Sequence, residues 1–337
     1  MLIEKHKNLK PFNSFGIDVF ADEYVKITTL EELKSALKHY QHKTLFILGG
    51  GSNILLTQDV KLPILHLLIK GIRIAKESEE RVWVVAMAGE NWHDFVQYCI
   101  AKDFGGIENL SLIPGNVGTA PMQNIGAYGV ELKDVFYSCT AIHVKTGQER
   151  VFSKDDCEFG YRSSVFKTQF KHQYVITEVC FELSKKSHRL NIAYGAIQEE
   201  LATKGIKHPT IKTVSEAVIA IRECKLPNPK ILGNAGSFFK NPVVDNASFE
   251  ALKKSFPEIP GYQTDQNHTK VPAGWLIDNL GLKGYRKGDA GVHKKQALVL
   301  VNYGKATGHE LLELSMYIQQ EVLKNYGIPL EAEVNIY

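Results

Sequence analysis

A run of three glycines at residues 49–51 follows directly on an apolar stretch, residues 44–48, that we expect to form a buried strand. The backbone N–H groups of consecutive glycines can approach an anion closely, and Ser52 and Asn53 add two short polar side chains. The segment could therefore cradle a diphosphate, although a glycine cluster on its own is more often a plain turn. Its spacing fits neither G-x-G-x-x-G nor G-x-x-x-x-G-K-[ST], which argues against a Rossmann fingerprint and against a P-loop.

A second glycine-rich loop covers residues 113–129. It holds four glycines and two prolines in seventeen residues, so it cannot be regular structure, yet it also carries Val117, Met122, Ile125 and Tyr128. A loop that is both glycine-rich and apolar suggests backbone packed against a large flat ligand, and a buried crossover explains it equally well. The two loops together favour a dinucleotide or a flavin.

Other polar residues in unusual surroundings are candidates for chemistry. Arg162 lies in a largely aromatic and apolar segment, residues 159–166, where its guanidinium must form a buried ion pair or serve as a fork for a ligand carboxylate or phosphate. Ser237 follows small residues and precedes two phenylalanines, but G-x-S-x-G is absent, which leaves a proton donor or a turn serine. Glu331 and Glu333 lie on one side of an expected strand, for which a solvated face is the default.

The composition limits the class of protein. The 337 residues include 40 Lys and Arg against 37 Asp and Glu, a net charge of +3, and nucleic-acid binding needs a more concentrated positive surface. The apolar runs are strand-sized and the start lacks the pattern of a signal peptide, so we expect a cytoplasmic, non-membrane protein of two or three domains. The five cysteines are widely spaced and the twelve histidines are scattered, so we expect neither a disulfide framework nor a metal site.

Helix and strand patterns are mixed along the chain, which indicates an α+β fold. Thr29 and Glu32 form a capping box, and an apolar face follows at Leu33, Ala36 and Leu37. Further strands are expected at residues 81–87, 140–144, 174–183, 297–301 and 330–336, and further helices at residues 92–100, 274–284 and 311–322. The polar, lysine-rich residues 185–230 are expected to mark a domain boundary.

Seven segments, taken in order, resemble one family along essentially the whole chain. They are residues 13–16 (NSFG), 48–56 (LGGGSNILL), 114–129, 160–167 (GYRSSVFK), 233–242 (GNAGSFFKNP), 273–278 (AGWLID) and 330–334 (LEAEV). This series is similar to that of the UDP-N-acetylenolpyruvoylglucosamine reductases, which are flavin enzymes of bacterial peptidoglycan synthesis.

The resemblance implies a fold and a set of ligands. The fold would be a vanillyl-alcohol-oxidase/PCMH-type FAD-binding fold of two subdomains, residues 1–68 and 69–205, followed by an α+β substrate-binding domain, residues 206–327. The terminal strand, about residues 328–337, would pack back near the first subdomain. FAD would be bound without a covalent link, NADPH would be the co-substrate, and UDP-N-acetylglucosamine enolpyruvate would be the substrate. The protein would be a monomer.

The resemblance also implies three catalytic residues. Arg162 and Glu333 would hold and polarise the carboxylate of the enolpyruvyl group, with Glu333 protonated or sharing a proton, and Ser237 would be the general acid. A serine is a poor acid in water, so this role requires a strongly basic carbon and a well-aimed hydroxyl. The resemblance therefore assigns Glu333 to the site and not to a solvated face, and Glu331 stays a surface carboxylate.

Other residues are implied as ligand contacts. The FAD contacts would be Gly49, Gly50, Gly51, Ser52, Asn53, Gly115, Gly118, Gln123, Ile125, Gly126 and Ala127, mostly through the backbone. The substrate contacts would be Tyr161, Tyr194, Lys225, Asn241, Tyr262 and Gln296, and Tyr194 matches the tyrosine that closes over the substrate in one subtype of the family.

The chain departs from the family pattern at three positions. Asn335 stands where Arg is common, and the sequence stops at Tyr337 in place of the usual short tail, which leaves the anchoring of Glu333 open. Ala120 replaces a common Ser, at the cost of one hydrogen bond near the flavin phosphate, and Met122 replaces Ile or Val harmlessly.

Two other functions stay open at this point. A flavin oxidase on the same fold would often tether its flavin through His or Cys, and neither glycine loop contains one, which disfavours it. A nucleotide-sugar binder that has lost its flavin is disfavoured by the intact glycine loops.

Overall fold

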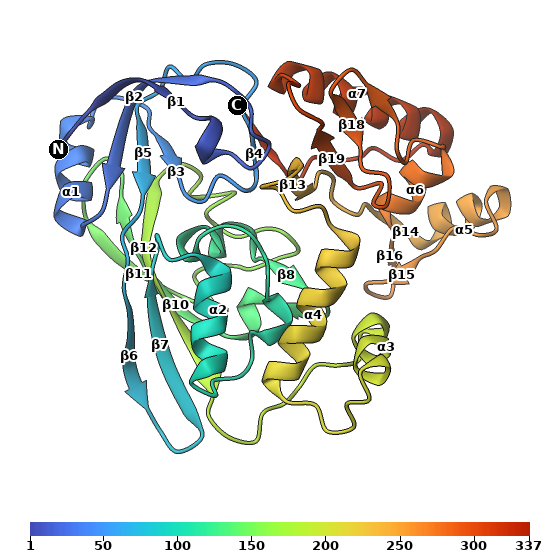
Figure 1. Ribbon diagram of the computed structural model, residues 1–337, viewed down its shortest axis with the longest axis horizontal. Helices are drawn as coiled ribbons and strands as arrows, with labels where there is room; N and C mark the ends of the chain where they lie inside the picture. The colour runs from blue at the N-terminus through green and yellow to red at the C-terminus, as the bar shows by residue number, and fades with distance from the viewer. The chain divides into compact units, whose positions relative to one another are not determined.

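The structure, a computed structural model, describes residues 1–337 and divides into two compact units. Unit 1 comprises Met1–Lys7, Ala21–Gly51 and Lys61–Cys224, and unit 2 comprises Asn8–Phe20, Ser52–Val60 and Lys225–Tyr337. Helices and strands are mixed throughout the chain, so the α+β prediction is confirmed (Figure 1). The finer division into three domains stays a prediction.

The first sheet of unit 1 has the strand order β1-β2-β5-β3. Its strands are β1 (Glu4–Asn8), β2 (Phe20–Ile27), β5 (Ile64–Leu67) and β3 (Phe46–Leu48). The central strand β5 runs parallel to both of its neighbours, β2 and β3, and all four of its residues are buried. Strand β3 ends at Leu48, so the sheet delivers the first glycine loop at its edge.

Helix α1 (Leu30–His39) begins as the sequence predicts. The Glu32 N–H donates to Thr29 Oγ1 at 3.1 Å, and the Thr29 N–H donates back to the Glu32 carboxylate at 3.2 Å. Leu33, Ala36 and Leu37 are buried and belong to the hydrophobic cluster of the first sheet. The capping box therefore fixes where the helix starts, and its apolar face fixes where it packs.

The second sheet of unit 1 is antiparallel and has the strand order β11-β10-β12-β7-β6. Its strands are β6 (Ile72–Glu77), β7 (Arg81–Met87), β10 (Phe136–His143), β11 (Glu149–Ser153) and β12 (Tyr174–Ser184). The strands predicted at residues 81–87, 140–144 and 174–183 are thus confirmed, with shifts at their ends. Helix α2 (Trp92–Ala101) packs its Trp92 and Phe95 rings into the core of this sheet.

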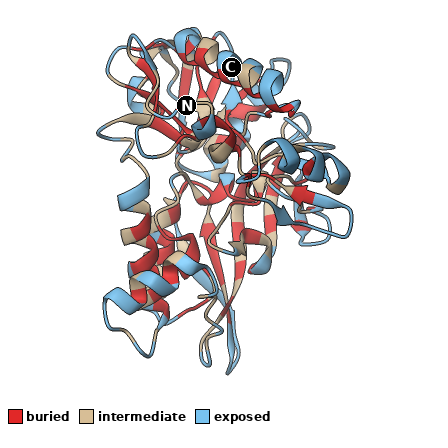
Figure 2. Ribbon diagram, turned by 90° about the vertical axis from the view of Figure 1, so that its right-hand side faces the viewer, coloured by how far each residue is buried: buried red, intermediate tan, exposed pale blue.

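The prediction for residues 185–230 was incomplete. Besides loop, this stretch contains helices α3 (Gly195–Thr203) and α4 (Ile211–Lys225). The buried residues Val214, Val218 and Ile221 of α4 recur at helical spacing, but the lysine-rich residues before α3 and after α4 make the whole stretch read as polar. Together the two helices bury a cluster of their own, and Figure 2 shows buried residues along the strands and inner helix faces while outer helix faces are exposed.

Unit 2 contains a four-stranded sheet, a three-stranded sheet and three helices. The first sheet has the order β13-β19-β18-β17, built from β13 (Gly233–Ser237), β19 (Val299–Asn302), β18 (Ala290–Val292) and β17 (Arg286–Lys287). The second has the order β14-β16-β15, built from β14 (Val243–Asp245), β16 (His268–Lys270) and β15 (Tyr262–Gln263). The helices are α5 (Asn246–Ser255), α6 (Ala273–Asn279) and α7 (Gly308–Tyr326).

The terminal strand is shorter than predicted. Of residues 330–336 only β20 (Asn335–Ile336) is a strand, and it pairs in parallel with β4 (Ile54–Leu55). The preceding residues form one isolated bridge, between Ala332 and Phe239. They are not a strand because this pairing does not continue to their neighbours. The segment still runs beside the end of β13.

No helix is long and apolar enough to cross a membrane. The five cysteines are free thiols, and no three residues of the metal-binding types gather in one place.

Candidate functional site

The two glycine loops of unit 1 touch through their backbones. A Cβ atom at Gly50 would lie 2.9 Å from the Gly115 Cα and 2.9 Å from Asn116 Oδ1, and a Cβ at Gly49 would lie 2.5 Å from Thr119 Cγ2. Real Cβ atoms do not approach backbone that closely, so only glycine fits. The loop 113–129 therefore lies directly on the end of β3, and the two loops form one surface.

The second loop is held by its own backbone against the end of β7. The Val117 and Gly118 N–H groups donate to the carbonyls of Glu90 and Ala88, at 2.9 and 3.0 Å. A Cβ at Gly118 would lie 2.4 Å from the Ala88 Cβ. Gly118 is thus required for close packing of the loop, and its N–H is already engaged.

By contrast, the first loop keeps backbone donors available. No backbone carbonyl accepts from the N–H groups of Gly50 and Gly51, and Gly51 has a φ of +62°, a conformation that glycine adopts without strain. Gly50 is exposed and Gly51 is buried. Backbone N–H groups that no backbone carbonyl accepts, beside a surface without Cβ atoms, fit the diphosphate of a dinucleotide, which the backbone must approach closely. These residues therefore satisfy the requirement of an FAD site.

A buried tyrosine–histidine pair supports the first loop from below. The Tyr24 hydroxyl lies 2.6 Å from His66 Nδ1, and His66 also makes a hydrogen bond with the backbone of Gly49. Both side chains are buried, and burial lowers the pKa of His66 to about 4. The ring is therefore neutral at physiological pH, and it links β2, β5 and the loop. No residue spacing in the sequence indicates this link.

Arg162 contacts the second loop. Its Nη2 donates to the Gly126 carbonyl at 2.9 Å, and a Cβ at Gly126 would lie 3.2 Å from Nη1. Arg162 itself has a φ of +53° in a turn closed by reciprocal backbone hydrogen bonds between Gly160 and Ser163. A non-glycine residue in that conformation is strained, and such strain concentrates at functional sites. The Tyr161 ring lies 5.5 Å from the guanidinium carbon.

Gly126 and Ala127 form β8 (Gly126–Ala127), which pairs with β9 (Val130–Glu131). The preceding residues form two short 3-10 turns, Val117–Thr119 and Pro121–Gln123. Ile125 is buried, and Ala120 at the family's usual serine position is also buried. The loop is thus ordered along its length, and Gln123 lies within it.

In unit 2, Ser237 ends strand β13 beyond a distortion. The pairing with β19 shifts register between Asn234 and Ser237, and Gly236 has a φ of +72°. The buried Asn234 fixes this bulge, because its Oδ1 accepts from the Gly236 N–H at 2.9 Å. The Asn234 amide donates in turn to two backbone carbonyls. A bulge of this kind re-aims the next side chain, here the Ser237 hydroxyl.

Glu333 is brought beside the Ser237 strand by backbone pairing. The Glu333 N–H donates to the Phe238 carbonyl at 2.8 Å, and the Lys240 N–H donates to the Glu331 carbonyl at 2.9 Å. Glu331 is exposed and forms an ion pair with Lys240, whereas Glu333 is only partly exposed. The two glutamates therefore differ as expected, with Glu331 at the surface.

Asn335, which stands where the family commonly has arginine, helps to anchor the Glu333 segment through hydrogen bonds to Asn53. Its N–H and its Nδ2 both donate to the Asn53 carbonyl, at 3.1 and 3.0 Å, and Asn53 Nδ2 donates to the Glu333 carbonyl at 3.3 Å. Asn53, a predicted flavin contact, thus also holds the Glu333 backbone.

Two predicted substrate contacts gather at the start of α6. Asn241 Oδ1 accepts from the Ala273 N–H at 3.0 Å, and Gln296 Oε1 would lie 3.5 Å from a Cβ at Gly274. Lys225 and Tyr262 are exposed in the same unit, and Tyr161 and Tyr194 are exposed in unit 1. No interaction of Lys225 or Tyr262 distinguishes them from ordinary surface residues.

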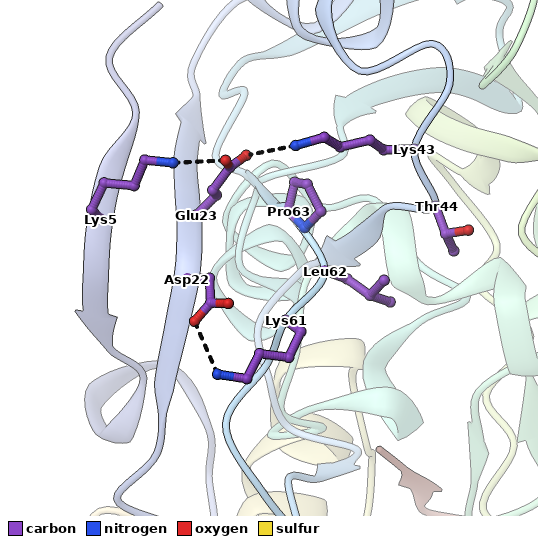
Figure 3. A pocket seen from close by; sticks show the side chains of 8 residues that line it. All are labelled: Lys5, Asp22, Glu23, Lys43, Thr44, Lys61, Leu62 and Pro63. Carbon is purple, nitrogen blue, oxygen red and sulfur yellow. Dashed lines mark hydrogen bonds and ion pairs between the residues drawn. The ribbon is translucent and has the colours of Figure 1, made fainter.

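One depression of unit 1 lies apart from all of these residues. It has a volume of about 450 Å³ and is lined by Lys5, Asp22, Glu23, Lys43, Thr44, Lys61, Leu62 and Pro63 (Figure 3). Its ammonium groups already pair with its carboxylates, Lys5 with Glu23 at 2.7 Å and Lys61 with Asp22 at 3.3 Å. It is therefore not part of the candidate site.

Comparison with known proteins gives a family match for an N-terminal and for a C-terminal part of the chain. A family model described as FAD binding domain matches residues 21–153, and one described as UDP-N-acetylenolpyruvoylglucosamine reductase, C-terminal domain, matches residues 228–337. The UDP-N-acetylenolpyruvoylglucosamine reductase of Flavobacterium johnsoniae is 53% identical over 336 residues, which cover 100% of both chains. That of Pseudomonas aeruginosa is 47% identical, over 99% of both chains.

A solved structure is similar over the same length. The crystal structure of UDP-N-acetylenolpyruvylglucosamine reductase from Thermus caldophilus has a TM-score of 0.71 and 26% sequence identity, and the match covers 100% of this chain and 99% of that chain. The FAD model spans both glycine loops, so the expectation of a flavin, and of its fold, is confirmed.

We predict that Gly50→Ala weakens FAD binding by roughly tenfold or more, because the added methyl group meets the backbone of Gly115 and overpacking of this kind costs about 1–3 kcal/mol. Gly195→Ala is the control, since a Cβ at Gly195 has no atom within 4 Å. Titration of the apoprotein with FAD, followed by flavin fluorescence, measures both. Wild-type affinity in Gly50→Ala would contradict the packing argument.

His66 gives a pH prediction. Its pKa is about 4 in the folded protein and 6.5 in the unfolded chain, so between these values only the unfolded chain binds the proton. The stability linked to the neutral ring is therefore present above pH 6.5 and is lost as the pH falls towards 4. Between pH 7.5 and pH 5, wild type should lose about 2 kcal/mol more unfolding free energy than His66→Gln.

Urea unfolding at the two pH values measures this difference. His39→Gln, a change at an exposed histidine, is the control and should lose as much as wild type. Equal losses in wild type and His66→Gln would show that His66 is not the acid-sensitive group.

Proposed function

The chain belongs to the UDP-N-acetylenolpyruvoylglucosamine reductase family, and we propose that it reduces UDP-N-acetylglucosamine enolpyruvate to UDP-N-acetylmuramate with NADPH as electron donor. The product is a precursor of peptidoglycan. The observation that carries the proposal is the glycine surface at Gly50 and Gly115, a flavin cradle in a chain that matches the family from end to end.

The glycine loops would hold FAD without a covalent link. Gly50 and Gly51 offer free N–H groups, and Gly126 presents a surface without a side chain beside Arg162. Bound there, FAD would supply hydride transfer from NADPH to the vinyl carbon of the sugar that is remote from the ether oxygen, and NADPH would leave before the sugar binds.

Arg162 would hold and polarise the substrate carboxylate. Hydride attack places negative charge on the neighbouring carbon, and the carboxylate shares that charge as an enolate-like species. A guanidinium has N–H donors in a fixed fork that matches a carboxylate, and the hydrogen bond from Nη2 to the Gly126 carbonyl orients that fork.

Ser237 would deliver the proton to the carbon beside the ether oxygen. The bulge at Gly236, fixed by Asn234, is what would aim the hydroxyl. Glu333, protonated or sharing a proton, would hold the carboxylate together with Arg162. Its backbone is tied to Phe238 and to Asn53, so its position depends on the strand that ends in Ser237.

The remaining expectations concern substrate contacts and setting. Asn241 and Gln296 at the start of α6, with Lys225, Tyr262, Tyr161 and Tyr194, would contact the UDP-sugar. We expect the protein to act as a monomer in the cytoplasm, with no nucleic-acid or membrane partner.

Ser237→Ala separates the two halves of the reaction. We predict that NADPH still reduces the flavin at close to the wild-type rate, because no proton from the protein is needed in that step. Reoxidation of the flavin by the enolpyruvyl sugar should slow by roughly 100-fold or more, the usual cost of losing a general acid. Stopped-flow absorbance of the flavin under anaerobic conditions follows each step separately.

Ser255→Ala, at an exposed serine of the same unit, is the matched control and should leave both steps unchanged. If Ser237→Ala slows both steps equally, the serine is structural and its role as proton donor is excluded.

Arg162→Lys tests the fork. A lysine keeps the positive charge and the same strained backbone position, but it cannot bind a carboxylate through two parallel N–H groups. We predict that kcat/KM for the sugar falls by about 10- to 100-fold, as expected for losing a charged hydrogen bond of about 1.5–3 kcal/mol. Steady-state assays with Arg189→Lys as the exposed control measure the effect, and near-normal turnover would mean that Arg162 is only a packing residue.

A further inference from the structure

Helices α3 and α4 form a small hydrophobic cluster of their own within unit 1. Its buried members are Ile197, Leu201, Val214, Ala217, Val218 and Ile221. Of the residues packed against it, only Tyr128 comes from outside residues 190–221. Tyr128 follows directly on the predicted flavin contacts Gly126 and Ala127, so it is where this cluster meets the second glycine loop.

Two asparagines join the segment before Tyr194 to the same point of the loop. Asn109 Nδ2 donates to the Tyr128 carbonyl at 3.0 Å and to the Asn191 carbonyl at 2.8 Å, and Asn191 Nδ2 donates to the Gly129 carbonyl at 2.9 Å. Asn109 is buried, so its amide is not exchanged for water at low cost. The backbone on both sides of this junction is therefore fixed.

The tyrosine rings meet at this junction. The Tyr128 and Tyr194 rings pack edge to face, with centroids 5.2 Å apart and planes at 88°. Tyr194 precedes the first residue of α3 and is 49% exposed. Its ring packs against the protein through the Tyr128 ring. Tyr128 has a φ of +50°, which a tyrosine adopts only when its surroundings hold it there.

Arg222 on α4 holds the other end of Tyr128. The guanidinium interacts with the Tyr128 hydroxyl, and its Nε is buried without a hydrogen-bond partner. Burial lowers the pKa of Arg222, and the only group that counteracts this effect is Tyr128. His93 also faces the guanidinium, but its Nδ1 accepts from the Leu112 N–H at 2.9 Å, and burial lowers its pKa.

A guanidinium so placed is costly, because a buried cation without a carboxylate partner loses hydration that one hydroxyl does not replace. The interaction with Arg222 therefore favours one orientation of the Tyr128 hydroxyl. The Tyr128 ring, whose backbone is held in the left-handed region, packs edge to face with the Tyr194 ring.

We propose that Arg222 is a positioning residue for the reduction of the enolpyruvyl sugar. Through the Tyr128 hydroxyl, Arg222 fixes the orientation of the ring against which Tyr194 packs. The inference rests on the proposed role of Tyr194 as a substrate contact. If loss of the hydroxyl lowers the fraction of molecules in which Tyr194 packs against Tyr128 from nearly all to about one tenth, the apparent affinity for the sugar falls about tenfold.

The test compares Tyr128→Phe, Arg222→Met and the double variant. Tyr128→Phe keeps the ring and removes only the hydroxyl, so it folds even if Arg222→Met does not. We expect each single variant and the double variant to raise the KM for UDP-N-acetylglucosamine enolpyruvate by the same roughly tenfold factor, with FAD content unchanged and kcat within about threefold. Tyr137→Phe and Lys212→Met, at exposed positions, are the controls.

A second readout does not depend on turnover. Hydrogen exchange of peptides covering residues 189–195 should be faster in Tyr128→Phe and in Arg222→Met, and not in the controls. If wild type fails to reduce the sugar, the proposed function fails, and the exchange rates alone decide whether Arg222 positions this loop.

Three outcomes overturn the inference. A costly Arg222→Met beside a silent Tyr128→Phe would mean that the guanidinium acts directly on a ligand. Additive effects in the double variant would mean that the two residues act separately. Loss of FAD from Tyr128→Phe would mean that the ring serves the flavin loop and not Tyr194.

Discussion

The approach of two backbones at Gly50 and Gly115 is the constraint on which the proposed flavin site depends. A Cβ at Gly50 would come within 2.9 Å of the Gly115 Cα, so the two loops can touch there only because Gly50 has no side chain. Their contact joins the end of β3 to the end of β7, and through them the two sheets of unit 1. The apolar side chains of the second loop, such as the buried Val117, belong to the core of unit 1, while its glycines allow close packing against Ala88 and against the first loop.

The same arrangement explains how a nearly neutral chain can handle anionic ligands. A net charge of +3 spreads no strong positive field, and FAD, NADPH and a UDP-sugar acid all carry negative charge. In the proposed site, backbone N–H groups at Gly50 and Gly51 and a few placed cations would supply the attraction locally. Arg162 is an example of such a cation. Its strained turn and its hydrogen bond to Gly126 both restrict the position of the guanidinium.

Local patterns predicted the elements, and the resemblance supplied the roles. The capping box at Thr29 and the apolar strand at residues 81–87 were correct because their determinants lie within a few residues of each other. Helices α3 and α4 were missed because each is stabilised by the other, and the hold of Asn335 on Asn53 spans 282 residues, which no local pattern encodes. Chemistry alone left Ser237 as a turn serine or a proton donor, and only similarity to a family singled out the second.

The central claim is that the glycine surface holds a flavin that carries electrons from NADPH to the enolpyruvyl sugar. The most direct measurement follows NADPH oxidation by the purified yellow protein under anaerobic conditions, with and without UDP-N-acetylglucosamine enolpyruvate. The account predicts that sustained turnover requires the sugar, with one sugar reduced for each NADPH consumed. NADPH oxidation that the sugar does not stimulate, or a colourless protein that takes up no FAD, would contradict it.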